Sequence, residues 1–373
     1  MKIAFVADVA YPWIRGGMEA MQYLEAKELA KKHEVHFFCI RWDSMKGSFK
    51  HDGIIYHAFP GWKYSKLYKK RRRSIREALL FAIGMLRIFR YRFDIIEAHM
   101  FPIMHLPVVK LYCRLTGCKL LMEVAEVWDK AYWQDYLGKR KGSIGYAYQE
   151  YAIKGADAYI SNPALEDKIG RYGIDTRRIR VFSPAIDEKS ISRTKAVKRE
   201  RRIAIVARLI KEKRVDKWLH IFREVKMKIP EVKGVIIGKG PEEKPLKALR
   251  HRLGLDKSVE MLKDLDRKEL YKIVKGSYVL VHMSEREGLS IITLESLALG
   301  TPVVLPSYTT IPSEVAGMCV VEDEEDIPGK VVEILRSDNP SSYISNRDRL
   351  KEFSLSSIND FYDELFSDLN RAN

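Results

Sequence analysis

The chain has 373 residues, 46% of them hydrophobic, and a formal net charge of +16 at pH 7. This length is sufficient for two domains, each with its own core. The sequence argues against a membrane-spanning protein, because the longest uncharged apolar run near a basic segment, Ala78 to Leu86, is far shorter than the ~20 residues that a spanning helix needs. The positive charge favours anionic partners such as nucleotides or phospholipid surfaces.

The cysteines indicate a reduced, cytoplasmic protein. Cys39, Cys113, Cys118 and Cys319 fit neither a disulfide framework nor the ligand spacing of a zinc site. We therefore expect packing residues and no metal site. Met1-Lys2-Ile3 leads directly into a strand pattern, so no signal peptide is expected.

The first predicted elements are a buried strand from Lys2 to Ala7, a loop that contains Gly16 and Gly17, and a helix from Met18 to Lys32. This order is typical of the first turn of a Rossmann-like domain. There the glycines let the backbone approach a ligand closely. An ordinary turn is the alternative, because paired glycines are common in loops.

After a second strand, Glu34 to Ile40, the segment Trp62–Arg92 is the most basic part of the chain, with eleven Lys and Arg residues and one acid. Aromatic residues alternate with these charges, which suits the edge of an anionic membrane. The alternative is a solvated helix whose apolar side packs on the sheet. That side would comprise Leu79, Leu80, Ile83 and Leu86. Nucleic acid is not an expected partner, because we find no recognition motif for it.

Two further strands are predicted, Phe93 to His99 and Leu120 to Val124. His99 ends the first strand, and Glu126 follows the second. Ligands of open α/β sheets bind at the carboxyl ends of strands, which makes His99 a candidate for ligand contacts. A structural hydrogen bond is an equally good explanation of His99. The charged, aperiodic residues 188–201 predict an interdomain linker.

The second domain begins with a buried strand from Arg202 to Ala207, and Arg208 follows at its end. Lys213 lies near the start of a predicted helix, Val215 to Met227. An arginine and a lysine at a helix N-terminus can clamp a diphosphate, the arginine bidentately and the lysine as a point charge. Chance placement among many basic residues is the alternative. A glycine turn then begins at Gly238.

The most informative stretch is a β-α-β unit between Ser277 and Pro306, whose helix begins near Ile291. The first backbone N–H groups of such a helix can bind an anion such as phosphate. These groups belong to Gly288, Leu289 and Ser290. Glu287 in the turn and Glu295 in the helix can accept hydrogen bonds from sugar hydroxyls. Alternatively, they are a solvated turn residue and an acid favoured by the helix dipole.

The string Glu-Gly-Leu-Ser-Ile-Ile-Thr-Leu-Glu, followed by Ser-Leu-Ala-Leu-Gly-Thr-Pro-Val-Val, resembles the signature of glycosyltransferase family 4. The segment from Ala207 to Asp216 resembles the family's Gly-Arg-Leu-x-x-x-Lys-Gly-x-Asp. Leu289 and Ser290 depart from the Phe and Gly that are frequent in the family. Lys263 stands where the family usually has Gly, which leaves the nucleotide base open.

This resemblance implies the α/β GT-B fold, with two Rossmann-like domains facing across a cleft and a C-terminal helix that crosses back to the first domain. Residues 1–187 would form the acceptor domain, 188–201 the linker, 202–353 the donor domain and 354–373 the returning helix.

The resemblance also implies retaining transfer of a sugar from a nucleotide diphosphate sugar to an acceptor hydroxyl. UDP-sugar is the first choice of donor and GDP-mannose the second, without a metal. The acceptor would be a glycan or a lipid-linked molecule at the cytoplasmic face of the membrane. The alternatives are an epimerase or hydrolase of the same fold and a non-catalytic binding subunit.

Three groups of residues are expected to carry this reaction. The catalytic group consists of Glu287, Arg208 and Lys213. The donor-binding group consists of Gly16, Gly17, Gly288, Leu289, Ser290, Glu295, Gly238 and Leu265. His99 and Glu126 are expected on the acceptor side.

Overall fold

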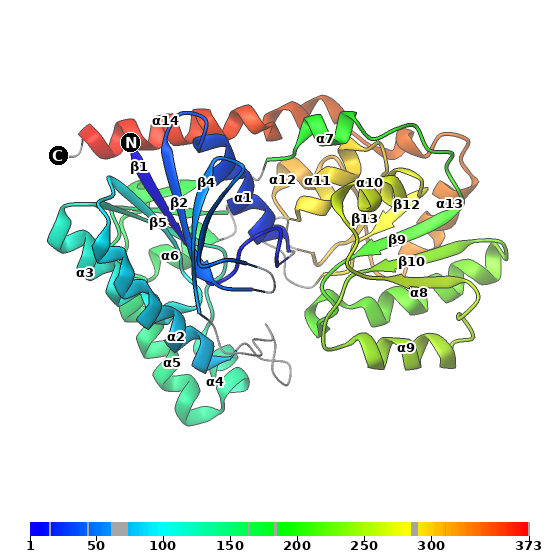
Figure 1. Ribbon diagram of the computed structural model, residues 1–373. Helices are drawn as coiled ribbons and strands as arrows, with labels where there is room; N and C mark the ends of the chain where they lie inside the picture. Colours follow the sequence, from blue (N-terminus) through cyan, green and yellow to red (C-terminus); the bar gives the residue numbers. More distant parts are fainter. Residues whose placement is uncertain are drawn as a thin grey trace. The chain divides into compact units, whose positions relative to one another are not determined.

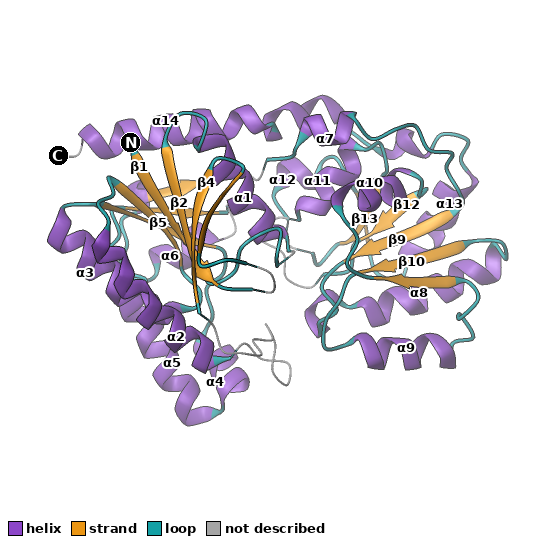
Figure 2. Ribbon diagram, in the orientation of Figure 1, coloured by secondary structure: helices purple, strands orange, loops and turns teal. Residues whose placement is uncertain are grey.

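The computed structural model describes residues 1–14, 16–42, 45–60, 74–162, 165–182, 185–284, 290–309 and 311–371. The chain divides into two compact units, Met1–Ala185 with Leu355–Asn373, and Ile186–Ser354 (Figure 1). Each unit has a sheet of mainly parallel strands with helices packed against it (Figure 2). Both units are therefore Rossmann-like, as the sequence predicts.

The first unit contains an eight-stranded sheet in the order β3-β4-β2-β1-β5-β6-β7-β8. The strands are β1 (Lys2–Val6), β2 (Glu34–Ile40), β3 (Ser48–His51), β4 (Ile54–Phe59), β5 (Ile95–His99), β6 (Lys119–Val124), β7 (Ala158–Ser161) and β8 (Ile179–Val181). Only the edge pair β3–β4 is antiparallel among these strands. The strand order reverses between β1 and β5, which is where ligands bind in sheets of this kind.

Helices cover both faces of this sheet. They are α1 (Gly17–Leu29), α2 (Ile75–Gly84), η1 (Met85–Arg90), α3 (Leu106–Thr116), α4 (Lys130–Leu137), α5 (Lys139–Ala152), α6 (Glu166–Gly170) and α14 (Leu355–Arg371). The C-terminal helix α14 packs beside α1. Its Tyr362 hydroxyl donates to Glu97 Oε2 at 2.7 Å, and Asp368 pairs with Arg180 at 2.8 Å. These contacts join the end of the chain to the first unit, as predicted.

The second unit contains a six-stranded parallel sheet in the order β11-β10-β9-β12-β13-β14. The strands are β9 (Arg202–Val206), β10 (Lys233–Ile237), β11 (Val259–Leu262), β12 (Val279–Val281), β13 (Val303–Pro306) and β14 (Val320–Glu322). The helices are α7 (Glu188–Ser192), α8 (Val215–Lys228), α9 (Glu243–Arg252), α10 (Arg267–Lys275), α11 (Ile291–Ala298), α12 (Ser313–Ala316) and α13 (Ile327–Arg336). Here the strand order reverses between β9 and β12.

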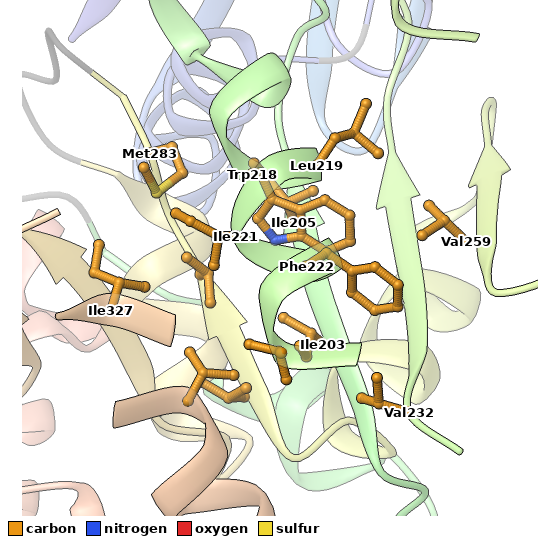
Figure 3. Packing of buried hydrophobic residues seen from close by; sticks show 14 of the residues in the cluster. Ile203, Ile205, Trp218, Leu219, Ile221, Phe222, Val232, Val259, Met283 and Ile327 are labelled. Carbon is orange, nitrogen blue, oxygen red and sulfur yellow. The ribbon is translucent and has the colours of Figure 1, made fainter. Parts of the chain in front are cut away.

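A glycine in a strand shapes the larger core of the second unit. The rings of Trp218 and Phe222 on α8 stack with centroids 5.4 Å apart and pack with Ile203 and Ile205 of β9 (Figure 3). A Cβ atom at Gly234 of β10 would lie 2.7 Å from the Phe222 ring and 2.9 Å from the Trp218 ring. Glycine is therefore the residue that leaves room for this aromatic pair.

Two sequence interpretations need revision. Residues 188–201 do not form a featureless linker, because their first part folds as α7 and Ile191 joins the core of the second unit. The apolar side of α2 and η1 does not pack on the sheet as a unit either. Leu79, Ile83 and Leu86 are 47%, 63% and 54% exposed. The part of Trp62–Arg92 up to residue 73 lies outside the described residues.

Candidate functional site

Parallel strands bring most of the predicted ligand residues to the carboxyl edges of the two sheets. In the second unit, Arg208 follows β9, Gly238 follows β10 and Leu265 follows β11. In the first unit, His99 ends β5 and Glu126 follows β6. Because the carboxyl ends of parallel strands lie at one edge of a sheet, the candidate residues of each unit lie together within that unit.

The loop after β9 is fixed by the loop after β10. The Leu209 amide donates to the Lys239 carbonyl at 3.0 Å, and the Glu242 amide donates to the Leu209 carbonyl at 2.9 Å. Gly238 has a φ of +150°, and a Cβ atom there would lie 1.9 Å from the carbonyl oxygen of Ala207. Gly238 is therefore required by the close crossing of two backbones. Its predicted contact with the donor stays a prediction.

Lys213 lies at the reversal point of the second sheet. It ends the short helix η5 (Lys211–Lys213), and Arg214, with a φ of +47°, turns the chain into α8. Lys213 Nζ donates to Ser284 Oγ at 3.2 Å, and Ser284 follows β12 and is 1% exposed. Arg208, exposed at the end of β9, lies at the same edge. The carboxyl edge of the sheet at β9 and β12 thus carries two cationic residues, as an anion site requires.

Glu295 is held in a buried ion pair that the sequence did not reveal. It is 3% exposed, and its Oε1 accepts from Tyr271 Oη at 2.6 Å and from Arg267 Nε at 3.1 Å. A second Arg267 nitrogen, Nη2, also contacts Oε1. Burial, and then the neighbouring Glu295, raise the pKa of Tyr271. Arg267 and Tyr271 are one turn apart on α10, so this helix fixes the orientation of the carboxylate.

The turn before α11 contains Glu287, Gly288 and Leu289, and it lies outside the described part of the chain. Their roles remain predictions from the motif. Ser290, the N-cap residue of α11, is 4% exposed. Leu265 is half-buried, and it packs on Ala204, Val235 and Ile237 near the edge of the sheet.

The glycine pair of the first unit lies at the start of α1. Gly16 is the N-cap residue and Gly17 the first helical residue. A Cβ atom at Gly16 would lie 2.1 Å from Glu19 Oε2. Glu19 is 6% exposed, and its Oε2 has no hydrogen-bond partner within the described residues. Gly16 thus makes room for a buried carboxylate in the first turn of the helix.

His99 has a defined tautomer. Its Nδ1 lies 2.6 Å from the Phe101 carbonyl oxygen, which can only accept, so Nδ1 carries the proton. Nε2 is buried and has no hydrogen-bond partner in the described ranges. An unprotonated Nε2 could accept a hydrogen bond or a proton from a ligand hydroxyl.

The carboxylate that interacts electrostatically with His99 is Glu123, whereas the predicted acceptor-side residue was Glu126. Glu126 is exposed on the loop after β6. Glu123 is 6% exposed within β6, accepts a hydrogen bond from Gln22 Nε2, and interacts electrostatically with His99. Burial raises the pKa of Glu123, although His99 and the Gln22 hydrogen bond oppose the shift. Glu123 was not among the predicted site residues, because it lies within a strand that is otherwise mostly apolar.

Glu123 belongs to a buried group of acids between α1 and the sheet. Burial is the main cause that raises the pKa of Glu25 and of Glu97, and the negative charge of the neighbouring acids adds to it. Such like-charged neighbours cannot all be ionised at low cost. Tyr362 of α14 donates to Glu97, so the C-terminal helix contacts this group directly.

Among the described residues, His, Cys, Asp and Glu side chains form no cluster of three or more that could hold a metal ion. Within the same ranges, every helix falls short of the length and apolar character needed to cross a bilayer.

Two family models match consecutive parts of the chain. The model described as "Glycosyltransferase Family 4" matches residues 15–190, and "Glycosyl transferases group 1" matches residues 187–349. The phosphatidylinositol N-acetylglucosaminyltransferase gpi3 subunit of Schizosaccharomyces pombe is 24% identical over 163 residues. That match covers 40% of this chain and 36% of the relative, so the chain spans well under half the length of this relative.

Solved structures share the fold over the entire chain. Sucrose-phosphate synthase from Thermosynechococcus elongatus has a TM-score of 0.80 at 15% identity, with 100% of both chains covered. Anabaena HepE in complex with UDP and glucose has a TM-score of 0.73 at 15% identity, with 99% of this chain and 100% of that chain covered. At such identities the similarity establishes the fold.

Proposed function

The chain belongs to glycosyltransferase family 4 with the GT-B fold, and on that premise we propose that it transfers a sugar from a nucleotide diphosphate sugar to an acceptor hydroxyl with retention of configuration. The observation that carries this proposal is the cationic edge of the second sheet. Arg208 and Lys213 lie there at the reversal point, and Lys213 is anchored by Ser284.

The chemistry of the leaving group explains why two cations are needed. Cleavage of the bond between sugar and diphosphate leaves negative charge on the phosphate oxygens. Arg208 can bind two of these oxygens at once, and Lys213 adds a point charge. Groups already positioned for developing charge stabilise a transition state most effectively. We propose that these residues replace a metal ion in this role.

Three further residues complete the proposed reaction. Glu295, oriented by Arg267 and Tyr271, would accept hydrogen bonds from the ribose hydroxyls. Glu287 would hold hydroxyls of the transferred sugar, a role that rests on the motif. His99 would receive the acceptor hydroxyl through Nε2, because Nδ1 is engaged by Phe101.

UDP-sugars are the first donors to test and GDP-mannose the second. The structural relative HepE binds UDP and glucose, which supports the first choice. The name of the fission-yeast relative describes transfer to phosphatidylinositol, which supports a lipid acceptor. A lipid acceptor, together with four free cysteines, favours a peripheral protein on the cytoplasmic face of a membrane.

The direct test follows labelled sugar from a panel of UDP- and GDP-sugars into a lipid extract that contains phosphatidylinositol. We expect label in the lipid phase with one donor class, and a loss of about 10²–10³ in turnover for Arg208→Ala. Arg252→Ala, an exposed arginine of α9, is the matched control. Nucleotide release or sugar inversion without acceptor would indicate a hydrolase or an epimerase. Binding without turnover would indicate a binding subunit.

A further inference from the structure

We propose that the outer side of α2, η1 and α3 is a docking surface for an anionic lipid membrane. Of the fifteen large apolar side chains that are exposed in the described part of the chain, seven lie on these three elements. They are Ile75, Leu79, Ile83, Leu86, Phe89, Leu111 and Leu115. Single exposed apolar residues are ordinary, but a group of them marks an interaction surface.

These residues form a second apolar stripe that is separate from the core. Phe81, Met85 and Ile88 cover the sheet and are each 0% exposed. Ile75, Leu79 and Ile83 recur every fourth residue along α2, so they share one side of the helix, and they are 47–63% exposed. A helix that is apolar on two sides has one side for its own core and one for a partner.

The stripe continues from η1 onto α3. The rings of Phe89 on η1 and Tyr112 on α3 lie 5.5 Å apart in an edge-to-face contact. Leu111 and Leu115, 51% and 66% exposed, follow each other by one turn on α3. Figure 1 shows α2 and α3 on the same side of the first sheet. The exposed apolar residues therefore come from elements in direct contact.

The charge of this surface identifies its partner. Residues 75–92 carry four arginines against Glu77, and α3 carries Lys110 and Arg114 without an acid. Arg87, Arg90 and Arg114 form no ion pair with a carboxylate within the described ranges. Arginines around an apolar stripe suit an anionic lipid surface, where apolar groups enter the interface and cations contact head groups. A second copy of this surface would bring equal positive charge and be repelled.

The docking surface also gives the acceptor a route to the site. It belongs to the same unit as His99, and the chain after His99 passes through the short helix η2 (Ile103–His105) into α3. A membrane held against α3 would supply an acceptor whose sugar-accepting hydroxyl is carried on a lipid. This assignment of the acceptor class rests on the proposed function, whereas the docking itself does not.

Vesicle flotation tests the docking surface. The protein is mixed with vesicles of phosphatidylcholine and phosphatidylglycerol in equal amounts, or of phosphatidylcholine alone. We expect flotation with the anionic vesicles that decreases as salt is added. Substituting Arg87→Gln together with Arg90→Gln should lower the partition coefficient about fivefold per arginine. Ile83→Ser together with Leu86→Ser should lower it at least about tenfold. Met227→Ser, 69% exposed on α8, is the matched control and should float like the wild type.

Melting curves with and without nucleotide, recorded on the same samples, show that each variant is folded and separate the two proposals. Absent flotation with an intact nucleotide shift overturns the docking surface and leaves the donor site standing. Intact flotation without any nucleotide shift supports the docking surface and overturns the donor site. Flotation that neither double substitution weakens also overturns the surface. A dimer that is seen by sedimentation without vesicles, and that the double substitution Ile83→Ser with Leu86→Ser dissociates, would also overturn the proposal. The surface would then bind a second copy of the chain instead of a membrane.

Discussion

Arg267→Ala is the substitution that tests the orientation of Glu295. In the wild type, Arg267 donates to Glu295 Oε1 through two nitrogens, and Tyr271 donates to the same oxygen at 2.6 Å. The substitution leaves a carboxylate that is 3% exposed with Tyr271 as its remaining donor. A charge buried in this way must either stay poorly solvated or take up a proton.

The expected magnitude follows from burial. Removing one partner of a fully buried pair costs about 3–5 kcal/mol. The Arg267 side chain is 20% exposed, so water can enter the vacated space, and we expect about 2–3 kcal/mol. For a unit of this size each kcal/mol lowers the melting temperature by about 2–4 °C, so the second unit should melt roughly 5–10 °C lower.

Scanning calorimetry or circular dichroism measures this shift, with Arg252→Ala on α9 as the control for loss of an arginine. Glu295→Gln in the Arg267→Ala background should recover part of the loss, because the unpaired charge is gone. If Arg267→Ala has the same melting temperature as Arg252→Ala and the wild type, the ion pair does not hold Glu295, and the reasoning is wrong.

Three further outcomes are expected. Glu25 has a pKa above its usual 4.5 in the fold, so stability declines as the pH rises from that value toward the folded-state pKa. Glu25→Gln should therefore melt higher than the wild type at pH 8, with a gain that shrinks toward pH 5; an equal gain at both values would contradict burial as the cause. Gly238→Ala should destabilise the second unit by more than about 2 kcal/mol in urea unfolding, whereas Gly329→Ala, which meets no atom within 4 Å, should cost nothing. Sugar transfer should persist in EDTA, because Arg208 and Lys213 supply the positive charge; a loss that Mg²⁺ or Mn²⁺ restores would show that a metal is needed.

The sequence predicted the parallel strands well, because strands buried on both faces form continuous apolar runs. The strand β9 was predicted as Arg202 to Ala207 and extends from Arg202 to Val206. Helix α11 begins at Ile291 as expected, and Gly300 has the left-handed φ of +82° that suits the end of a helix. The outer strand β3 of the edge hairpin was not predicted, because it is short, polar and mostly exposed, and the buried apolar strand β4 was missed as well.

Contacts between distant segments could not be predicted. Arg267 and Glu295 are 28 residues apart, and each alone looks like a surface charge on an amphipathic helix. Glu25, Glu97 and Glu123 come from three elements that meet only when α1 covers the sheet. In the sequence, the buried and the exposed apolar stripes of α2 and η1 could not be told apart. Periodicity shows that a helix has apolar sides, but it does not show which side packs on the sheet.

Nucleotide-dependent melting tests the central claim most directly. UDP, GDP, ADP and dTDP are added in turn to the wild type, Arg208→Ala, Lys213→Ala and the control Arg252→Ala. A nucleotide at about 100 times its dissociation constant stabilises the second unit by about 2.7 kcal/mol, which is a shift of several degrees. We predict that one nucleotide raises the melting temperature of the wild type and the control, and that both clamp variants lose the shift. An equal shift in Arg208→Ala and Lys213→Ala, or no shift with any of the four, would contradict a diphosphate site at the reversal point of this sheet.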